Sequence, residues 1–318
     1  MKARVFITGG TGFVGANLVR RLVRDGHEVH LLVRPGYQPW RVVGLEKQVQ
    51  LHEVFLADST SVDRVVADIR PQWVFHLAVS GAYSWQKDLD EMVQTNIQGT
   101  INLVRAALKV GVEVFVNTGS SSEYGLKSSP PTEESLLEPN SDYAVTKASA
   151  TLFCQFTAKQ DKVRIPTLRL YSAYGPFEDP NRLFPNLVTH GLKGVFPPLV
   201  SPDVARDFVY VDDVVDAFIR VAEHTTGDYG PIYNVGTGVQ VTLREIVDTA
   251  QRCLSIPGEP VWSTMAARSW DTKSWVADSR RIKNELGWRP SYGLEEGFKA
   301  FAKWYAENAC FRSAYEVV

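Results

Sequence analysis

The chain has 318 residues, of which 44% are hydrophobic and 22% charged, and its net charge is -2. This length suits one large α/β domain or two domains that share a core. The balanced charge gives no reason to expect nucleic acid or an anionic membrane surface as a partner. The chain starts without a signal-peptide-like apolar stretch, has no apolar run of bilayer length, and carries three cysteines without metal-ligand spacing. We therefore expect a cytoplasmic protein with reduced thiols, no metal, and no nucleic-acid or membrane partner.

The first half of the chain alternates between apolar, β-rich runs and amphipathic helical patterns. The runs predict strands at Arg4–Thr8, Glu28–Val33, Val49–Leu56, Val74–Ala78 and Val112–Thr118. The patterns between them predict helices at Val14–Asp25, Ser61–Ile69 and Asp88–Val110. Nearly continuous apolar strands that alternate with helices are typical of a parallel sheet covered on both faces.

Beyond about residue 170 the pattern becomes irregular and rich in proline, as in "GPFEDPNRLFP". A helical segment, Asp212–His224, follows "RDFVYV" and has Asp212 as its expected N-cap, and the strand-like "PIYNVG" comes next. We predict an α/β fold, a Rossmann-type doubly wound parallel sheet with a smaller mixed α/β C-terminal lobe. The predicted dinucleotide-binding domain comprises residues 1–170 with returning segments at about 207–236, and the substrate lobe comprises 171–206 and 237–318.

The stretch "VFITGGTGFVG" places glycines between the first strand and the first helix. Glycines at such a turn let the backbone approach a pyrophosphate closely, and the pyrophosphate then lies against the helix N-terminus. A glycine pattern alone is a weak signal, but its position in a strand–turn–helix unit makes a mere glycine-rich turn the poorer interpretation. We predict that a dinucleotide contacts Gly9, Gly12, Phe13, Val14 and Gly15.

The end of the second strand bears on which dinucleotide binds. NAD sites often have an acidic residue there for the ribose hydroxyls, whereas this chain has Arg34 in "HLLVRPG". A guanidinium suits the additional 2′-phosphate of NADP, and Arg41 could assist it, although a solvated surface arginine is the alternative. Asp58, in "LADS", suits either a hydrogen bond to the adenine or the cap of a turn. We therefore favour NADP(H) as the cofactor, with NAD(H) as the alternative.

A second candidate site lies in "SDYAVTKAS", where Tyr143 and Lys147 are four residues apart and share one face of a helix. A phenol titrates near pH 10, and a nearby ammonium would lower its pKa by roughly 1–3 units. Such a pair can exchange a proton with an alcohol or an alkoxide, and the lysine can also bind a nicotinamide ribose. A tyrosine and a lysine at this spacing also occur by chance. The evidence for a reactive pair is therefore their position in the chain, after the glycine turn and a strand end that carries hydroxyl groups.

These landmarks in order resemble the extended short-chain dehydrogenase/reductase family, which comprises nucleotide-sugar epimerases, dehydratases and reductases. The resemblance covers essentially the whole chain through "TGGTGFVG", "FHLA", "TNIQGTINLVRAA", "GSSSEYG", "DYAVTKAS", "LRLYSAYGP", "RDFVYVDDVVDA", "YNVGTG" and "ELGWRPSYGLEEG". It implies a nicotinamide cofactor on the N-terminal sheet and a small-molecule sugar nucleotide in the C-terminal lobe. It also implies a homodimer, for which Asp88–Val110 and Tyr143–Gln160 are the candidate helices.

The resemblance also implies roles for individual residues. Ser120 would hydrogen-bond the reacting carbonyl oxygen beside Tyr143, and Arg206 and Arg268 would bind the substrate diphosphate. Further cofactor positions implied in this way are Leu77, Ala78, Asn96 and Lys147, with a purely structural role for Asn96 left open. The implied substrate positions are Ser80, Ser121, Ser122, Ser172, Arg182, Arg206 and Arg268. Ser172 stands where the family usually has an asparagine, so we expect the contacts with the substrate diphosphate to differ from the family pattern.

The reaction is predicted from the turn after the fifth strand. Dehydratases of the family carry two acids there, one to protonate the leaving hydroxyl and one to remove a proton, but this chain has Ser121 and Ser122. Glu123 is one residue out of register and would point away if the segment is extended. We favour NADPH-dependent reduction of the 4-keto group of a nucleotide-linked 6-deoxysugar, with Tyr143 as proton donor. A C4 epimerase with tightly bound NAD is the alternative, and a dehydratase or a non-catalytic dinucleotide sensor ranks lower.

Overall fold

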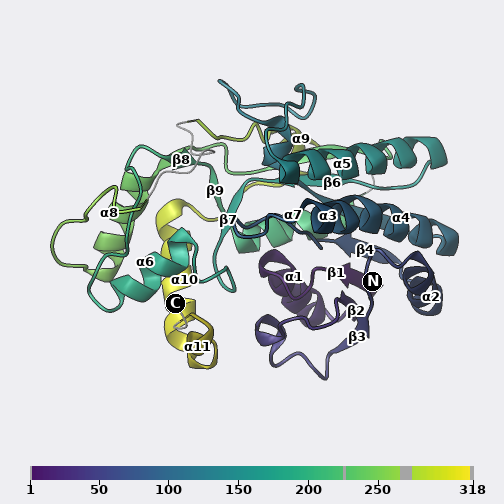
Figure 1. Cartoon of the computed structure of the whole chain (residues 1–318), viewed down its shortest axis with the longest axis horizontal. Coiled ribbons are helices and arrows are strands. Elements are labelled where there is room, and N and C mark those ends of the chain that lie inside the picture. The colour runs from purple at the N-terminus through teal and green to yellow at the C-terminus, as the bar shows by residue number, and fades with distance from the viewer. Residues whose placement is uncertain (1, 225–226, 266–273, 316–318) are drawn as a thin grey trace.

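The computed structural model describes residues 2–224, 227–265 and 274–315. Its centre is a seven-stranded parallel sheet in the order β10-β6-β5-β4-β1-β2-β3 (Figure 1). The strands are β1 (Arg4–Thr8), β2 (Glu28–Val33), β3 (Val49–Glu53), β4 (Trp73–His76), β5 (Val114–Ser120), β6 (Thr167–Leu170) and β10 (Ile232–Val235). The strand order reverses between β1 and β4, which is where doubly wound sheets bind their ligands. The predicted fold class is confirmed.

Helices cover both faces of the sheet because side chains along each strand alternate between the two faces. Within β1, Val5 and Ile7 belong to one core, whereas Phe6 between them belongs to the core on the opposite face. The helices of the first face are α1 (Phe13–Arg24) and α7 (Val211–Glu223), and those of the second are α2 (Ser59–Ile69), α4 (Gly99–Val110) and α5 (Asp142–Asp161). Burial on both faces explains why the strands read as continuous apolar runs.

Two predicted helices differ from the observed ones. The single helix expected over Asp88–Val110 is divided into α3 (Leu89–Met92), a π-helical turn η2 (Val93–Gln98) and α4. Such turns within helices frequently occur at functional sites. The helix expected from Asp212 begins at Val211, and Asp212 lies in its first turn and is not its N-cap. The backbone hydrogen bonds define where this helix starts, and the spacing of hydrophobic residues does not reveal them.

The C-terminal lobe has its own core. The helices α6 (Leu183–Gly191), α8 (Leu243–Leu254) and α10 (Leu294–Glu307) pack together, and the aromatic rings of Tyr174 and Phe184 stack between them with centroids 3.9 Å apart. Two small sheets are separate from the large one. They pair β7 (Ser172–Tyr174) with β9 (Phe208–Tyr210) and β8 (Ala205–Arg206) with β11 (Val241–Thr242).

The chain passes between the two parts several times. It leaves the large sheet after β6, forms α6, returns through α7 and β10, and leaves again for α8 (Figure 1). The helix α9 (Arg280–Leu286) packs beside β10, although it lies inside the range that we predicted for the substrate lobe. Among the residues that the structure describes, no helix combines the length and the apolar character needed to cross a membrane.

Candidate active site

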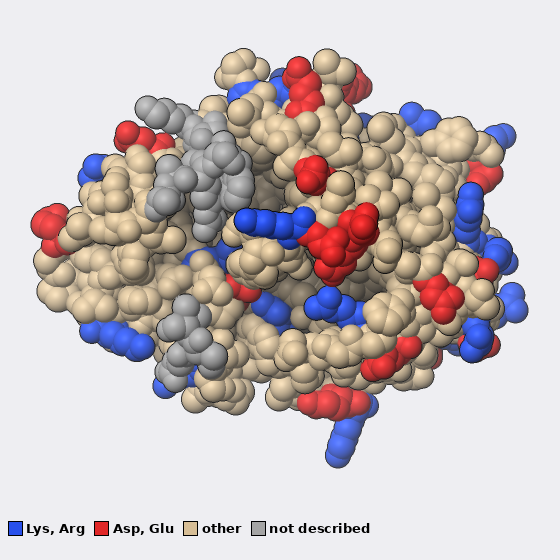
Figure 2. Space-filling view, viewed as in Figure 1, with Lys and Arg blue, Asp and Glu red and all other residues tan. Residues whose placement is uncertain are grey.

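A cleft of about 2160 Å³ lies between the carboxyl ends of the strands and the C-terminal lobe. Both parts line it, for example with Gly12, Ser120 and Tyr143 from the sheet side and with Arg206 and Leu243 from the lobe. Figure 2 shows the hollow near the middle of this face, with Lys and Arg atoms in its depth. The place matches the topological switch point at which an α/β sheet of this kind binds its ligand.

The glycine turn at one end of the cleft has the shape of a dinucleotide cradle. A Cβ atom on Gly15 would lie 2.1 Å from the Gly9 carbonyl oxygen, and Gly9 itself has a φ of +70°. Any side chain at Gly15 would therefore force the strand–turn–helix junction apart. Phe13 and Val14 begin α1 directly behind the turn, and all of these residues line the cleft. No side chain caps the start of this helix, and a helix N-terminus with free amide groups is a suitable place for a pyrophosphate.

The residues expected at the adenosine end have different surroundings. The Arg34 side chain is 67% exposed, and its guanidinium lies 3.5 Å from the Glu91 carboxylate. Asp58 caps α2: its carboxylate accepts hydrogen bonds from the Ser61 amide at 3.1 Å and the Ser61 hydroxyl at 2.6 Å. Of the two roles left open for Asp58, the structure therefore shows the cap. The Arg41 guanidinium donates to the Phe177 carbonyl oxygen at 2.7 Å, which limits its reach toward Arg34.

The three residues expected at the reacting end meet in the cleft. Tyr143 and Lys147 lie in the first turns of α5, which Ser141 caps, and Ser120 ends β5. The Lys147 ammonium donates to the Thr118 carbonyl oxygen at 2.6 Å. Burial raises the pKa of the Tyr143 phenol, and the hydrogen bond with the Ser120 hydroxyl opposes that rise. Burial also lowers the pKa of Lys147. Burial thus outweighs the other influences on the Tyr143 phenol, and the lowering of its pKa by Lys147 stays a prediction.

Asn96 forms hydrogen bonds with the residues that support this site. Its side-chain amide donates to the Ser80 carbonyl oxygen at 2.8 Å and to the Thr146 hydroxyl at 2.9 Å, and it accepts from the Ser80 amide at 2.9 Å. Both amide protons of Asn96 are therefore used to fix the loop after β4 against α5. Of the described residues, Leu77, Ala78 and Gly81 line the cleft near this loop, but Asn96 and Ser80 do not. For Asn96 these contacts fit the structural role that the sequence left open, and the buried Ser80 likewise lies behind the cleft wall, which does not favour the substrate contact expected of it.

Glu123 is buried on the far side of the serine turn η3 (Ser121–Tyr124). Its carboxylate accepts from the Ser120 amide at 2.8 Å and from the Thr151 hydroxyl at 3.0 Å, and it forms an ion pair with Arg169 at 2.8 Å. The segment is a helical turn and is not extended. The Glu123 side chain therefore points away from the cleft because of its hydrogen bonds and ion pair, and not because of the alternation of an extended strand. Glu123 closes a capping box and is absent from the described residues that line the cleft.

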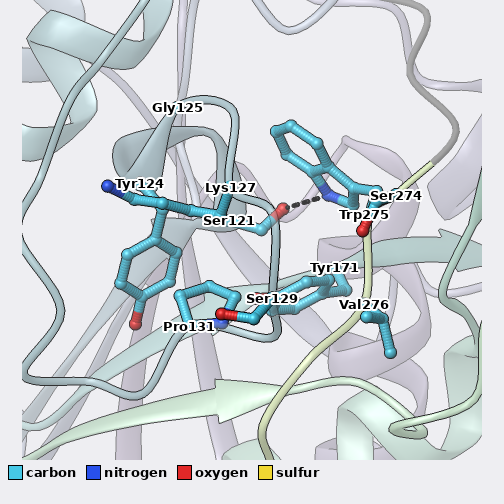
Figure 3. A pocket seen from close by; sticks show the side chains of 10 residues that line it. All are labelled: Ser121, Tyr124, Gly125, Lys127, Ser129, Pro131, Tyr171, Ser274, Trp275 and Val276. Carbon is cyan, nitrogen blue, oxygen red and sulfur yellow. Dashed lines mark hydrogen bonds between the residues drawn. The ribbon is translucent and has the colours of Figure 1, made fainter.

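Ser121, the first residue of this turn, has a hydrogen-bond partner that no sequence motif indicated. The Trp275 indole N–H donates to the Ser121 hydroxyl oxygen at 3.0 Å (Figure 3). Both residues line the cleft and also a small side pocket behind the turn, where the buried Tyr171 hydroxyl has no hydrogen-bond partner within the described part of the chain. A tryptophan far along the chain carries no spacing signal, so sequence reasoning could not connect it with Ser121.

The expected substrate residues of the C-terminal lobe lie along the same cleft. Arg182, Arg206 and Ser172 line it, as Ser121 and Ser122 do from the opposite side. The Arg206 guanidinium lies 5.3 Å from the centre of the Trp275 ring. Arg268 lies outside the described residues.

The sequence analysis also did not identify a buried acidic residue that lines the cleft. Glu178 lines the cleft with 5% of its surface exposed, and one carboxylate oxygen lies 3.7 Å from the Arg182 guanidinium. Burial raises its pKa to about 8. The residue sits in a proline-rich stretch in which no period or motif would single it out.

Fold and site together define an oxidoreductase-type enzyme of the extended short-chain dehydrogenase/reductase class. The chain belongs to the NAD dependent epimerase/dehydratase family, whose family model matches residues 5–236. It is 30% identical to a UDP-glucose 4-epimerase of Mycolicibacterium smegmatis, over 96% of this chain and 99% of the relative.

Solved structures agree with this assignment. The UDP-glucose 4-epimerase of Thermotoga maritima with UDP-glucose superposes with a TM-score of 0.86 at 26% identity, covering 96% of this chain and 99% of that one. The UDP-glucose 4-epimerase of Thermus thermophilus, a complex with NAD, gives a TM-score of 0.82 at 27% identity and covers 99% of this chain and all of that chain (100%). The family is thus one of NAD-dependent nucleotide-sugar enzymes.

Proposed function

We propose that the protein is an NAD-dependent nucleotide-sugar 4-epimerase that acts on a UDP-hexose. The observation that carries the proposal is the arrangement of Ser120, Tyr143 and Lys147 in one cleft with the glycine turn. The epimerase relatives match this chain over nearly its whole length, which supports the choice among reactions. This reverses the order that the sequence alone favoured, in which a reductase came first.

The chain's own residues divide the work as follows. The glycine turn would hold NAD, which would supply reversible hydride transfer at the sugar carbon that bears the reacting hydroxyl. Tyr143 takes the hydroxyl proton and gives it back, and Ser120 holds the oxygen through a hydrogen bond. Lys147 is fixed by the Thr118 carbonyl and adds positive charge beside the site. The keto sugar has to turn between the two transfers, and a cleft of about 2160 Å³ leaves room for this.

A 4-keto reductase remains the second candidate, because the same trio would serve it and Arg34 suits NADPH. Two facts weaken that support. Arg34 is largely exposed, and the Glu91 carboxylate 3.5 Å away would repel a 2′-phosphate. NAD is therefore the cofactor that we propose, with NADP as the alternative that a binding assay would detect.

The elimination reaction of the dehydratases ranks lower. Ser121 and Ser122 provide no acid at the turn, and Glu123 is held in its ion pair with Arg169. A non-catalytic dinucleotide sensor ranks lowest, because all three residues of the reactive trio are present.

The test is to purify the protein without added cofactor, denature it and identify the released nucleotide. The protein is then incubated with UDP-glucose, UDP-galactose, UDP-glucuronate or a 4-keto-6-deoxysugar nucleotide, and the products are separated by chromatography. We expect retained NAD and interconversion of two C4 epimers without net change in cofactor absorbance. Net oxidation of NADPH with the keto sugar would instead establish the reductase, and release of water from a UDP-hexose would establish the dehydratase.

A further inference from the structure

We propose that Trp275 is a positioning residue of this site, which fixes the Ser121 hydroxyl as a hydrogen-bond donor to the hexose of a nucleotide sugar. The inference rests on the proposed function and adds a residue to it. Trp275 comes from the C-terminal lobe, whereas Ser121 belongs to the serine turn of the sheet, so their contact joins the two walls of the cleft (Figure 3).

The direction of the hydrogen bond determines what Ser121 can do. An indole N–H only donates, so the Ser121 oxygen is the acceptor in the 3.0 Å contact with Trp275. The hydroxyl proton of Ser121 then has to point elsewhere. Ser121 is 6% exposed, and it borders both the cleft and the side pocket behind the turn. A sugar oxygen in the cleft is the acceptor that this proton would meet, one residue from Ser120 and thus next to the reacting carbon.

The ring of Trp275 reaches the other end of the substrate. The Arg206 guanidinium lies 5.3 Å from the ring centre, within the range of a cation–π contact. Arg206 lines the cleft and is the residue proposed for the substrate diphosphate. One side chain thus contacts both the group that would bind the sugar and the group that would bind the phosphates.

The backbone around Trp275 is held firmly enough for this role. Its amide donates to the Gln240 side-chain oxygen at 3.0 Å, and the Ala277 amide donates to the Asp207 carboxylate at 3.0 Å. Asp207 is fully buried and directly follows Arg206, and it also accepts from the Thr237 and Gly238 amides at 2.8 and 2.9 Å. Asp207 therefore ties the segment of Trp275 to the strand that carries Arg206.

The test separates the indole N–H from the ring. Trp275→Phe keeps a ring beneath Arg206 but removes the donor, so the KM for UDP-hexose should rise roughly three- to tenfold, as expected for one lost hydrogen bond. The inhibition constant of UDP alone, which lacks the sugar, should change by less than about twofold because the ring under Arg206 remains. Ser121→Ala should raise the same KM, and the double variant should be no worse than Ser121→Ala, because the tryptophan acts through the serine.

Trp262→Phe is the matched control. Trp262 also lies in the C-terminal lobe, with the Arg244 guanidinium 5.3 Å from its ring, but it is not among the described residues that line the cleft. Its kinetics should equal those of the unaltered enzyme, and all variants should retain NAD. The inference is overturned if Trp275→Phe leaves the KM unchanged, or if its effect adds to that of Ser121→Ala. If the unaltered protein converts no UDP-hexose at all, the proposed function itself fails and the inference falls with it.

Discussion

At the scale of single residues, Tyr143 is the group on which turnover should depend most. Tyr143→Phe removes only the phenol oxygen, so we expect kcat to fall by about 10²- to 10⁴-fold, the usual contribution of a general acid or base. NAD should remain bound, because the glycine turn that we expect to hold its pyrophosphate is untouched. Steady-state kinetics and the nucleotide content of the purified variant measure both effects. Tyr229→Phe, at an exposed tyrosine outside the cleft, is the control, and near-normal turnover by Tyr143→Phe would exclude this tyrosine as the proton carrier.

Glu178 should make the protein less stable as the pH rises. Burial raises its pKa from the ordinary value of 4.5 to about 8, so the folded chain keeps a proton that the unfolded chain releases between these values. The free energy of unfolding therefore falls across this window, and each pKa unit corresponds to about 1.4 kcal/mol.

Glu178→Gln mimics the protonated acid and should remove this dependence. Urea unfolding at about pH 5 should give similar stabilities for both proteins, whereas at about pH 9 the variant should be the more stable. The same substitution at the exposed Glu259 should have no such effect. If the stability difference between Glu178→Gln and the unaltered protein does not change with pH, the Glu178 carboxyl titrates normally.

At this scale, the sequence was sufficient to identify site residues that lie close to one another in the chain. The glycines of the turn and the pair Tyr143 and Lys147 meet in the cleft because each set belongs to one continuous element. Trp275 and Glu178 were missed because Trp275 makes its contact with a segment far away in the chain and Glu178 owes its properties to burial. No periodicity reports either feature.

At the scale of elements, the ion pair between Glu123 and Arg169 ties the serine turn to β6 and, through the Thr151 hydroxyl, to α5. Glu123→Gln keeps the shape of the side chain but leaves the buried Arg169 charge without its counter-ion. We expect a loss of about 3–5 kcal/mol in the free energy of unfolding, the cost of breaking a buried pair from one side. Denaturant titration measures it.

The control for that loss is Glu295→Gln, which breaks an exposed pair with Lys299 on α10 and should leave the unfolding midpoint unchanged. An equally stable Glu123→Gln variant would mean that Glu123 has no structural role, and its place in the turn would then have to be explained by chemistry.

The long elements could be predicted from the sequence, and the short ones could not. The five strands of the first half were expected within a few residues of their observed bounds, because most of them are apolar runs and β3, VQLHE, begins with apolar and polar residues in alternation. The strands β7, β8, β9 and β11 have two or three residues, too few to show an alternation. The π-helical turn of η2 continues directly into the helix after it, so only its hydrogen bonds distinguish it.

At the scale of the whole molecule, α5 presents an apolar stripe that the described chain does not cover. Val145, Leu152 and Phe156 are 48%, 54% and 63% exposed, and their spacing places them on one side of the helix. Leu89 and Val93 on the adjacent helical segments are exposed as well. We expect this stripe to pack against its copy in a homodimer, since large exposed apolar surfaces commonly mark interfaces.

Phe156→Glu should convert that dimer to a monomer, because it would place two charges inside the apolar contact. Light scattering after size-exclusion chromatography measures the mass. Leu136→Glu, at a residue 74% exposed and outside α5, should leave the mass unchanged. A monomeric mass for the unaltered protein at micromolar concentration would refute the expected dimer.

The repeated crossing of the chain between its two parts has a consequence for synthesis. The strand β10 completes the sheet beside β6, but it begins at Ile232, long after β6 ends at Leu170. Until that segment leaves the ribosome, the amides of Ile165, Thr167 and Tyr171 lack the carbonyl partners that they have in the finished fold. An open strand edge can pair with another chain. Nascent chains and fragments that end before Ile232 would therefore be prone to aggregate, and removing the C-terminal third would damage the dinucleotide-binding sheet as well as the substrate lobe.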